Sequence, residues 1–389
     1  MNFLSDLDFT DKRVLYRVDI NSSISDGAIA DDTRIQAIVP TLKLMLDAGA
    51  KQVVILAHQG RGREKSPKTV LNLHAVRLSE LMEQEVIKLD ACRGVSIPAE
   101  AKLVMLENVR LDDEADEDVS KREAFANELS EYGDVYVNDA FAACHRDHAT
   151  ISALPRIMTD KAAGLLLQKE LEALQPLLDG DVEHPFTMIV AGAKIDTKIG
   201  VIQQFYDIAD HVLLGGGIAN TFLAAEGYDV GESLKEEDKM ELAREIALEI
   251  DKRGKKLHIP DDVICADEIS EDAVAIDVPI EDVMGSMKIL DIGRKTAKDF
   301  ARIIKESKAV IWNGPVGLAE ISSFRNGSEM IARAMVDCEG KTFVGGGESV
   351  GVINSLGISH DSFTHVSTGG GAMLEFLSGE KLPGVEALS

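Results

Sequence analysis

The chain has 389 residues, of which 45% are hydrophobic and 28% are charged, as in an ordinary folded protein. A chain of this length exceeds the size at which a single hydrophobic core stops growing, so we expect two domains. The formal net charge of −26 argues against nucleic acid and anionic membranes as partners, although a local basic cluster can still bind an anionic small substrate.

The cysteine pattern and the N-terminus bear on the compartment. The cysteines Cys92, Cys144, Cys265 and Cys338 are scattered without a CxxC pair or zinc-ligand spacing, which is typical of reduced thiols. The N-terminal residues lack the apolar region of a secretory signal, and no apolar run approaches the ~20 residues that span a bilayer. We therefore expect a cytoplasmic protein that does not cross a membrane.

Apolar strand-like runs alternate with amphipathic helical patterns through the first half of the chain. The runs are residues 14–20, 52–58, 103–109 and 135–141. The helical patterns between them are residues 33–50, 73–86 and 122–133. This alternation predicts βαβ units, which build a parallel sheet.

Residues 163–178 form a long helical pattern stopped by Pro176, which predicts a rigid connector with a domain boundary near Leu174. The alternation then resumes, with strand-like runs at residues 186–192, 211–217, 288–293, 309–314 and 342–347. We therefore predict an α/β fold. It has two doubly wound, Rossmann-like parallel-sheet domains, residues 1–173 and 174–372, joined by a helix, with a hinge cleft.

Cationic and polar side chains follow the predicted strands of the first half. They are Asp19 and Asn21, then Arg34 near the start of the next helix, His58 and Arg61, Arg110, and finally His145, Arg146 and His148. The carboxyl ends of parallel strands share one edge of a sheet, so we expect these arginines to converge. Guanidinium groups bind phosphate and carboxylate bidentately, which predicts an anionic substrate that carries both. The His145/His148 spacing also suits a metal, but without a third ligand a hydrogen-bonding role is favoured.

Glycine-rich turns follow strand-like runs in the last fifth of the chain: VIWNGPVG (310–317), VGGGES (344–349) and VSTGGGA (366–372). Such turns let backbone N–H groups and a helix N-terminus meet phosphate oxygens. Their number favours a kinase-like enzyme over ordinary loops.

Further phosphate-binding candidates lie in the second half. Lys194 and Lys198 are four residues apart in AGAKIDTKIG (191–200), so if both are helical they share one face; a solvated helix face is the alternative. GGGIANTF (215–222) is a second glycine turn, or only a tightly packed one. Glu320 either accepts from ribose hydroxyls or caps a helix, and Glu348 either binds Mg²⁺ or answers a helix dipole.

Taken together, these motifs resemble the phosphoglycerate kinase family. The matching segments, in order, are RVDIN, DDTRI, AHQGR, ENVR, VNDAF with HR, GAKIDTK, GGGIANTF, WNGPVG, VGGGE and HVSTGGGAMLEFLSGEKLPGVEAL, from about residue 13 to the C-terminus. AHQGR and ENVR look like the archaeal branch of the family.

The resemblance implies a first domain that binds 3-phosphoglycerate, a second that binds Mg-ATP or Mg-ADP, and a C-terminal segment, residues 373–389, that packs back on the first domain. The substrate-binding residues it implies are Asp19, Asn21, Arg34, His58, Arg61, Arg110, His145 and Arg146. The implied nucleotide-binding residues are Gly192, Ala193, Lys194, Lys198, Gly215, Gly216, Asn313, Pro315, Leu318, Glu320, Gly346, Gly347, Glu348 and Ser349. Arg34, Lys194, Gly370 and Gly371 are expected to act on the migrating phosphoryl group, and Glu348 to bind Mg²⁺.

The chain departs from the family pattern at a few positions. Glu348-Ser349 replaces the usual Asp-Thr, Gly62 replaces a proline, Ser22-Ser23 replaces Val-Pro, and Ala191 stands where glycine is common. The Gly62 and Ser22-Ser23 changes predict looser substrate loops.

The expected reaction is reversible, Mg-dependent phosphoryl transfer between 3-phosphoglycerate/ATP and 1,3-bisphosphoglycerate/ADP, in glycolysis and gluconeogenesis. It needs no general base, because the attacking carboxylate is already ionised, and it implies hinge closure. A non-catalytic nucleotide sensor on the same fold is the alternative. A nicotinamide-dependent dehydrogenase is disfavoured, since the first strand leads into DINSSISDG rather than GxGxxG. We expect a monomer, with a homodimer left open.

Overall fold

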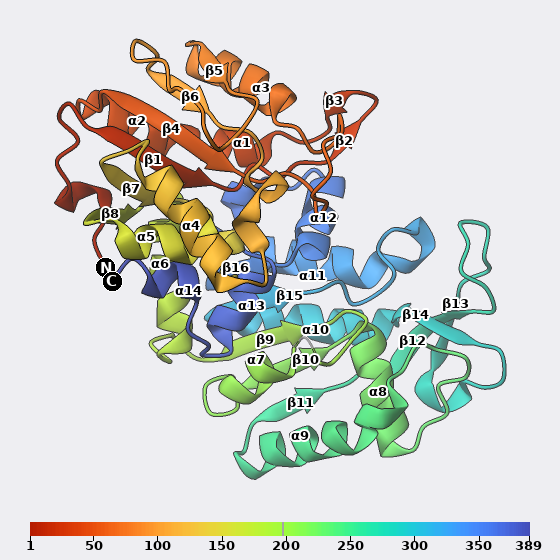
Figure 1. Ribbon diagram of the computed structural model, residues 1–389. Coiled ribbons are helices and arrows are strands. Elements are labelled where there is room, and N and C mark those ends of the chain that lie inside the picture. The colour runs from red at the N-terminus through yellow and green to blue at the C-terminus, as the bar shows by residue number, and fades with distance from the viewer. Residues whose placement is uncertain (197) are drawn as a thin grey trace. The chain divides into compact units, whose positions relative to one another are not determined.

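The computed structural model describes residues 1–196 and 198–389. They divide into two compact units: unit 1 is Met1–Glu172 with Lys381–Ser389, and unit 2 is Ala173–Glu380 (Figure 1). The division lies inside helix α6 (Leu165–Leu178). Pro176 does not stop this helix, which continues to Leu178. A proline so close to the end removes only one hydrogen bond of the last turn.

Unit 1 is built on a parallel sheet of buried apolar strands. Within the described residues it has six strands in the order β5 (Val86–Lys88), β6 (Leu103–Met105), β4 (Gln52–Ala57), β1 (Arg13–Val18), β7 (Val135–Asn138) and β8 (Asp160–Ala163). Every residue of β4, β6 and β7 is buried. Continuous burial is expected of a parallel sheet with helices on both faces. A short hairpin, β2 (Ile24–Ser25) with β3 (Ala28–Ile29), stands apart from the sheet.

The helices of unit 1 are α1 (Thr33–Ala37), α2 (Val39–Asp47), α3 (Asn72–Met82), α4 (Val119–Ser130), α5 (Leu154–Ile157) and α14 (Pro383–Glu386). The prediction of one continuous helix over residues 33–50 is wrong, because α1 ends at Ala37 and α2 begins at Val39. Pro40 explains the break: it has no backbone N–H to donate to the carbonyl of Gln36 and so cannot continue α1, yet it fits the first turn of a helix.

Unit 2 contains a second parallel sheet, again of six strands within the described residues. Their order is β11 (Lys256–His258), β10 (His211–Leu214), β9 (Phe186–Val190), β15 (Ala309–Asn313), β16 (Lys341–Gly345) and β17 (His365–Val366). Trp312 on β15 is completely buried and anchors the core on one face of this sheet.

The run 288–293 was expected in the parallel sheet, and that prediction is wrong. It forms β14 (Lys288–Ile292), which pairs antiparallel with β12 (Asp262–Ala266); β13 (Ile276–Pro279) pairs with the other edge of β12 (Figure 1). A short apolar run does not reveal its partner, and β12 and β13 were not recognised in the sequence.

The helices of unit 2 are α7 (Ile199–Gln204), α8 (Gly216–Glu226), α9 (Met240–Lys252), α10 (Arg294–Glu306), α11 (Asn326–Val336), α12 (Gly347–Ser355) and α13 (Gly371–Leu377). Three of them, α8, α12 and α13, begin within the glycine turns singled out in the sequence. Among the described helices, none is both long and apolar enough to cross a membrane.

The C-terminal segment divides between the units. Only Lys381–Ser389 groups with unit 1, where Gly384 N donates to Cys144 O at 2.9 Å. Residues 373–380 stay with unit 2, since Ser378 lies against Gly200 of α7. The segment that joins unit 1 is therefore shorter than the expected 373–389.

Candidate active site

Strand order explains why the polar residues of unit 1 come together. β6, β4, β1 and β7 are neighbours and run parallel, so their carboxyl ends meet at one edge of the sheet. Asp19 follows β1 directly and His58 follows β4 directly. Arg110 lies in the turn after β6, and Arg146 in the segment after β7. We call this edge the cationic rim.

Hydrogen bonds, buried or partly buried, connect the loops of the cationic rim to each other. The Gln59 side chain accepts from Ser22 N at 3.0 Å and donates to Ser22 O at 2.7 Å. Asn21 Oδ1 accepts from Gly60 N at 2.8 Å, and Arg110 donates to Gly60 O. Gln59 therefore fixes the loop after β1, in which Ser22-Ser23 stands where the family pattern has Val-Pro.

Arg34 forms an ion pair with Asp19, whose other oxygen accepts from Asn21 N at 3.0 Å. This pair fixes the Asp19 carboxylate, while the Arg34 side chain keeps 40% of its surface exposed. Arg34 can therefore be reached by a ligand. Arg61 is also exposed, but no described contact joins it to the other members of the rim.

The charges of the rim act on one another. Burial, then Arg17 and Arg146, lower the pKa of Arg110. Burial, followed by Arg17 and Arg110, holds the pKa of His58 well below its ordinary value, and burial also lowers that of His148 to about 3. These shifts place the cations within electrostatic reach and leave the two histidines neutral at physiological pH.

Three residues beneath the rim were not predicted from the sequence: Arg17, Glu114 and Thr150. All three are buried, and Arg17 is only 1% exposed although it is charged. An arginine inside an otherwise apolar strand is the one signal that could have found Arg17.

Lys194 and Lys198 do not meet the condition under which they would share a helix face. α7 begins at Ile199, so Lys194 and Lys198 both lie in the turn before it. Lys198 Nζ donates to Asn313 O at 3.3 Å. Burial lowers the pKa of Lys198 to about 8, and the nearby Glu348 opposes that shift. Lys198 is thus a half-desolvated cation beside a carboxylate.

The glycine turns of unit 2 pack directly on one another. Gly314 has φ +94°, and a Cβ there would lie 2.0 Å from Ala191 O, so no other residue fits. Gly314 N donates to Ser349 Oγ at 2.7 Å, which joins the 313–317 turn to the 345–349 turn. Asn313 Nδ2 is buried and has no hydrogen-bond partner among the described residues, which leaves a donor for a ligand.

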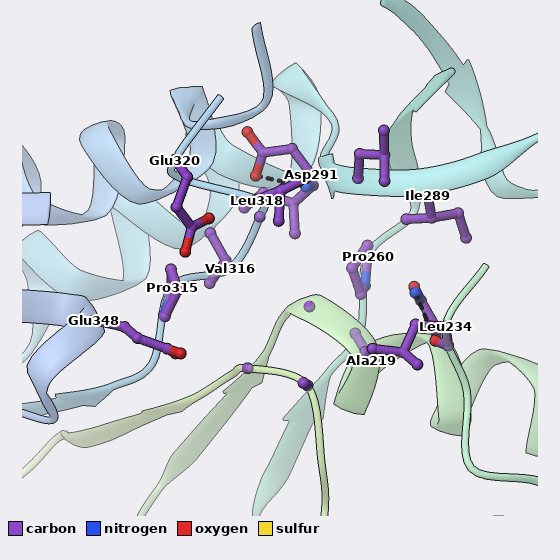
Figure 2. Close-up of a pocket in the computed structure, with 18 of the residues that line it drawn as sticks. Ala219, Leu234, Pro260, Ile289, Asp291, Pro315, Val316, Leu318, Glu320 and Glu348 are labelled. Carbon is purple, nitrogen blue, oxygen red and sulfur yellow. Dashed lines mark hydrogen bonds between the residues drawn. The ribbon is translucent and has the colours of Figure 1, made fainter. Parts of the chain in front are cut away.

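A cavity of about 200 Å³ lies between these turns and the start of α8 (Figure 2). Seven predicted nucleotide-binding residues line it: Gly192, Ala193, Gly216, Pro315, Leu318, Glu320 and Glu348. The other predicted residues, Lys194, Lys198, Gly215, Asn313, Gly346, Gly347 and Ser349, lie outside that lining within the described chain. The cavity has room for part of a nucleotide rather than all of it.

The two ends of the cavity differ in chemistry (Figure 2). Glu320 and Glu348 are exposed at one end, and Ala219, Leu234 and Ile289 line the other. None of these apolar residues was predicted, because no local pattern distinguishes them from ordinary core.

Two polar groups also line the cavity. Asn220 Oδ1 is buried without a partner among the described residues, while its Nδ2 donates to Leu234 O. Burial raises the pKa of Asp291 to about 7, and its carboxyl accepts from Gly327 N at 2.8 Å. An apolar slot with one unsatisfied acceptor suits a heteroaromatic base that carries an N–H group.

The Gly370–Gly371 turn begins α13. Gly370 has φ +50°, and Ser367 Oγ accepts from Gly369 N at 3.0 Å. The hydroxyl holds the turn in place, as a fixed set of backbone donors requires.

Among the described residues, no group of three or more His, Cys, Asp or Glu could hold a metal ion. Glu348 is exposed in the first turn of α12. One free carboxylate fits Mg²⁺, which is commonly bound by one or two carboxylates together with substrate phosphates and water.

Three comparisons with known proteins agree. The family model described as phosphoglycerate kinase matches residues 4–380. A phosphoglycerate kinase of Roseiflexus sp. (strain RS-1) is 42% identical over 395 residues, covering 99% of this chain and 98% of that protein. One from Moorella thermoacetica is 41% identical over 393 residues, with the same coverage of 99% and 98%.

Solved structures give the same result. The phosphoglycerate kinase of Coxiella burnetii has a TM-score of 0.88 and 33% identity, covering 100% of this chain and 98% of its own. That of Pyrococcus horikoshii OT3 has a TM-score of 0.86 and 31% identity, with the same coverage of 100% and 98%. These values do not separate branches of the family, so the archaeal likeness of AHQGR and ENVR stays a prediction.

Proposed function

This chain belongs to the phosphoglycerate kinase family, a family of phosphotransferases, and on that premise we propose how its two units divide the reaction. Unit 1 binds 3-phosphoglycerate at the cationic rim. Unit 2 binds ATP or ADP, with the base and ribose in the cavity and the phosphates toward the lysine turn. The phosphoryl group moves reversibly between the nucleotide and the carboxylate of 3-phosphoglycerate.

The observation that carries this proposal is the cationic rim itself. Side chains from the ends of adjacent parallel strands give a protein of net charge −26 a cluster of cations. Burial and the neighbouring cations lower the pKa of Arg110 and of His58, which supports a site that favours an anion. 3-Phosphoglycerate carries both a phosphate and a carboxylate, which guanidinium groups bind bidentately.

On the substrate side we assign binding to the set predicted from the sequence. It consists of Asp19, Asn21, Arg34, His58, Arg61, Arg110, His145 and Arg146. Asp19 and Asn21 accept from substrate hydroxyl groups or orient Arg34, and the arginines neutralise the two anionic ends. The ion pair between Arg34 and Asp19 supports this division of roles.

On the nucleotide side, the apolar end of the cavity takes the base and Glu320 accepts from the ribose hydroxyls. Lys198 and Asn313 Nδ2 face the phosphates. The unpartnered Asn313 donor and the half-desolvated Lys198 amine support this arrangement, because both gain more from an anion than they would on an open surface.

The chemistry needs placement and charge neutralisation more than covalent help. Arg34 and Lys194 neutralise the migrating phosphoryl group, and the Gly370 and Gly371 backbone N–H groups donate to it. The carboxylate of 3-phosphoglycerate attacks in its ionised form, so no general base is required. Mg²⁺, when bound through Glu348 and the nucleotide, supplies further neutralisation of the phosphate charge.

We also propose that Mg²⁺ is the metal used, that the protein works in the cytoplasm and that it is a monomer. The free thiols of its four cysteines are consistent with a reducing compartment. The relatives described above are named phosphoglycerate kinase, which gives no support to the alternative of a non-catalytic nucleotide sensor.

Calorimetric titration of each ligand tests the division between units. Arg110→Ala is expected to weaken 3-phosphoglycerate binding and leave ADP binding unchanged. Lys198→Ala is expected to do the reverse. If either variant weakened both ligands equally while remaining folded, the assignment of one ligand to each unit would be wrong.

A further inference from the structure

A buried carboxylate that the proposed mechanism does not use lies beneath the cationic rim. Glu114, in the short helix η3 (Asp113–Ala115), is 0% exposed. Both of its oxygens accept from Thr150: Oε2 from the backbone N at 2.8 Å and Oε1 from Oγ1 at 2.6 Å. A buried carboxylate persists only where such partners satisfy it.

Thr150 also connects Glu114 to a buried arginine. Its Oγ1 accepts from Arg17 Nε at 2.7 Å and donates to Glu114 Oε1. A terminal nitrogen of Arg17 lies 3.6 Å from Glu114 Oε1. Glu114 is therefore the counter-charge of Arg17, without which a fully buried guanidinium would be strongly destabilised.

Arg17 in turn fixes the protonation of His58. A terminal nitrogen of Arg17 lies 3.2 Å from His58 Nδ1, and the other donates to Val18 O. A guanidinium has only donors, so His58 Nδ1 must accept, and the ring is then neutral with its proton on Nε2. The cations around His58, namely Arg17, Arg34 and Arg110, together with His148, act against a second proton on the ring.

We propose that Glu114 and Thr150 are positioning residues that act through Arg17 to hold His58 as a neutral Nε2–H donor for 3-phosphoglycerate. This inference rests on the proposed function for the identity of the ligand. The tautomer itself follows from the contacts of the unliganded protein. With the tautomer fixed in advance, binding needs no proton rearrangement on the ring, and the donor keeps one orientation.

Thr41 provides a matched control for Thr150. It is equally buried, and its hydroxyl also donates to a buried carboxylate of unit 1, Asp139. None of its described hydrogen bonds involves Arg17 or His58. Thr150→Val and Thr41→Val therefore remove the same kind of bond, and only the first interrupts the path to His58.

The test is the ¹⁵N spectrum of the histidine rings in the ligand-free protein, with His58 assigned from its absence in His58→Gln. We expect the wild type to show a neutral ring with an accepting Nδ1 and a protonated Nε2. Thr150→Val and Glu114→Gln should give a mixture of tautomers, while Thr41→Val keeps the wild-type signal and Thr150→Ser restores it.

Kinetics supply the second readout. Thr150→Val should raise KM for 3-phosphoglycerate about tenfold, the usual effect of weakening a hydrogen bond to a charged ligand, with KM for Mg-ATP unchanged. Thr41→Val should change neither constant.

Two results would overturn the proposal. One is an Nδ1-protonated or doubly protonated His58 in the wild type, which is independent of whether any variant folds. The other is equal behaviour of Thr150→Val and Thr41→Val in both readouts. If 3-phosphoglycerate did not bind the wild type while the tautomer was as expected, the proposed function would fail and the positioning of His58 would stand.

Discussion

At the scale of single residues, Lys198 makes the clearest electrostatic prediction. Burial lowers its pKa to about 8, so it loses its charge as the pH rises through that value. Nucleotide phosphates bind the charged form, so kcat/KM for Mg-ATP should fall above about pH 8. Lys198→Arg stays charged throughout this range and should abolish the fall.

The pH profile of kcat/KM measures this in the free enzyme, before phosphate binding raises the pKa of the lysine. A fall of the same size in Lys198→Arg would mean that another group titrates, and Lys198 would lose its assigned role.

Residues at strand ends could be predicted from the sequence, but residues beneath them could not. His58 and Arg110 follow apolar runs directly, so the geometry of a parallel sheet suffices to bring them together. Glu114 and Thr150 are 36 positions apart, and nothing local to either indicates that they meet. The role of Asn220 could not be predicted either, because whether its side-chain oxygen has a partner depends on the residues packed around it.

At the scale of elements, the loops after β1 and β4 depend on Gln59. Gln59→Leu removes both hydrogen bonds to the Ser22 backbone while keeping a side chain of similar bulk. Because the freed loops carry Asn21 and His58, KM for 3-phosphoglycerate should rise severalfold, and KM for Mg-ATP should not change.

Gln52 supplies the control, since it is a buried glutamine at the opposite end of β4 that donates to Pro98 O and Ala101 O. Gln52→Leu should affect thermal stability rather than either KM. If Gln59→Leu left KM for 3-phosphoglycerate unchanged, the two loops would not need their connection for binding.

Element type was more predictable than element pairing. The parallel strands around β1 and β9 follow from alternating apolar runs and helices. β14 was misassigned because β12, its partner strand, was not recognised in the sequence, and a strand's partner is a tertiary property. The break between α1 and α2 could have been predicted from Pro40, because a proline has no backbone N–H with which to continue α1.

At the scale of the whole molecule, the proposed chemistry predicts a change in dimensions. In-line transfer needs the two substrates in contact and shielded from water, yet each is assigned to a different unit. Small-angle scattering with both 3-phosphoglycerate and a non-hydrolysable ATP analogue should therefore give a smaller radius of gyration than either ligand alone.

The two ligands measured singly are the controls for this experiment. An unchanged radius with both ligands at saturation would count against closure.

Chain length and the helical connector pattern were enough to predict two units and the position of their boundary. A boundary near Leu174 was expected, and the units separate between Glu172 and Ala173. The return of the chain to unit 1 was predicted from the family resemblance, because no pattern in the residues indicates it. Its start at Lys381 depends on the packing of α13 within unit 2.

If the two units divide the reaction as proposed, ADP release depends on both of them at once. The wild type should release ADP from Mg-ATP in the steady state only when 3-phosphoglycerate is present. Lys194→Ala should reduce that rate by roughly 10²–10³, the usual cost of losing one donor to a transition-state oxygen. Lys239 pairs with Asp196 at 2.8 Å in the same region and has no assigned role, so Lys239→Ala should stay near the wild-type rate.

Steady-state ADP release by these three proteins, with and without 3-phosphoglycerate, is therefore the most direct measurement. Release that requires both 3-phosphoglycerate and Lys194 is the predicted result. Release that does not change with 3-phosphoglycerate, or a Lys194→Ala rate equal to the wild type, would contradict the proposed transfer between the two ligands.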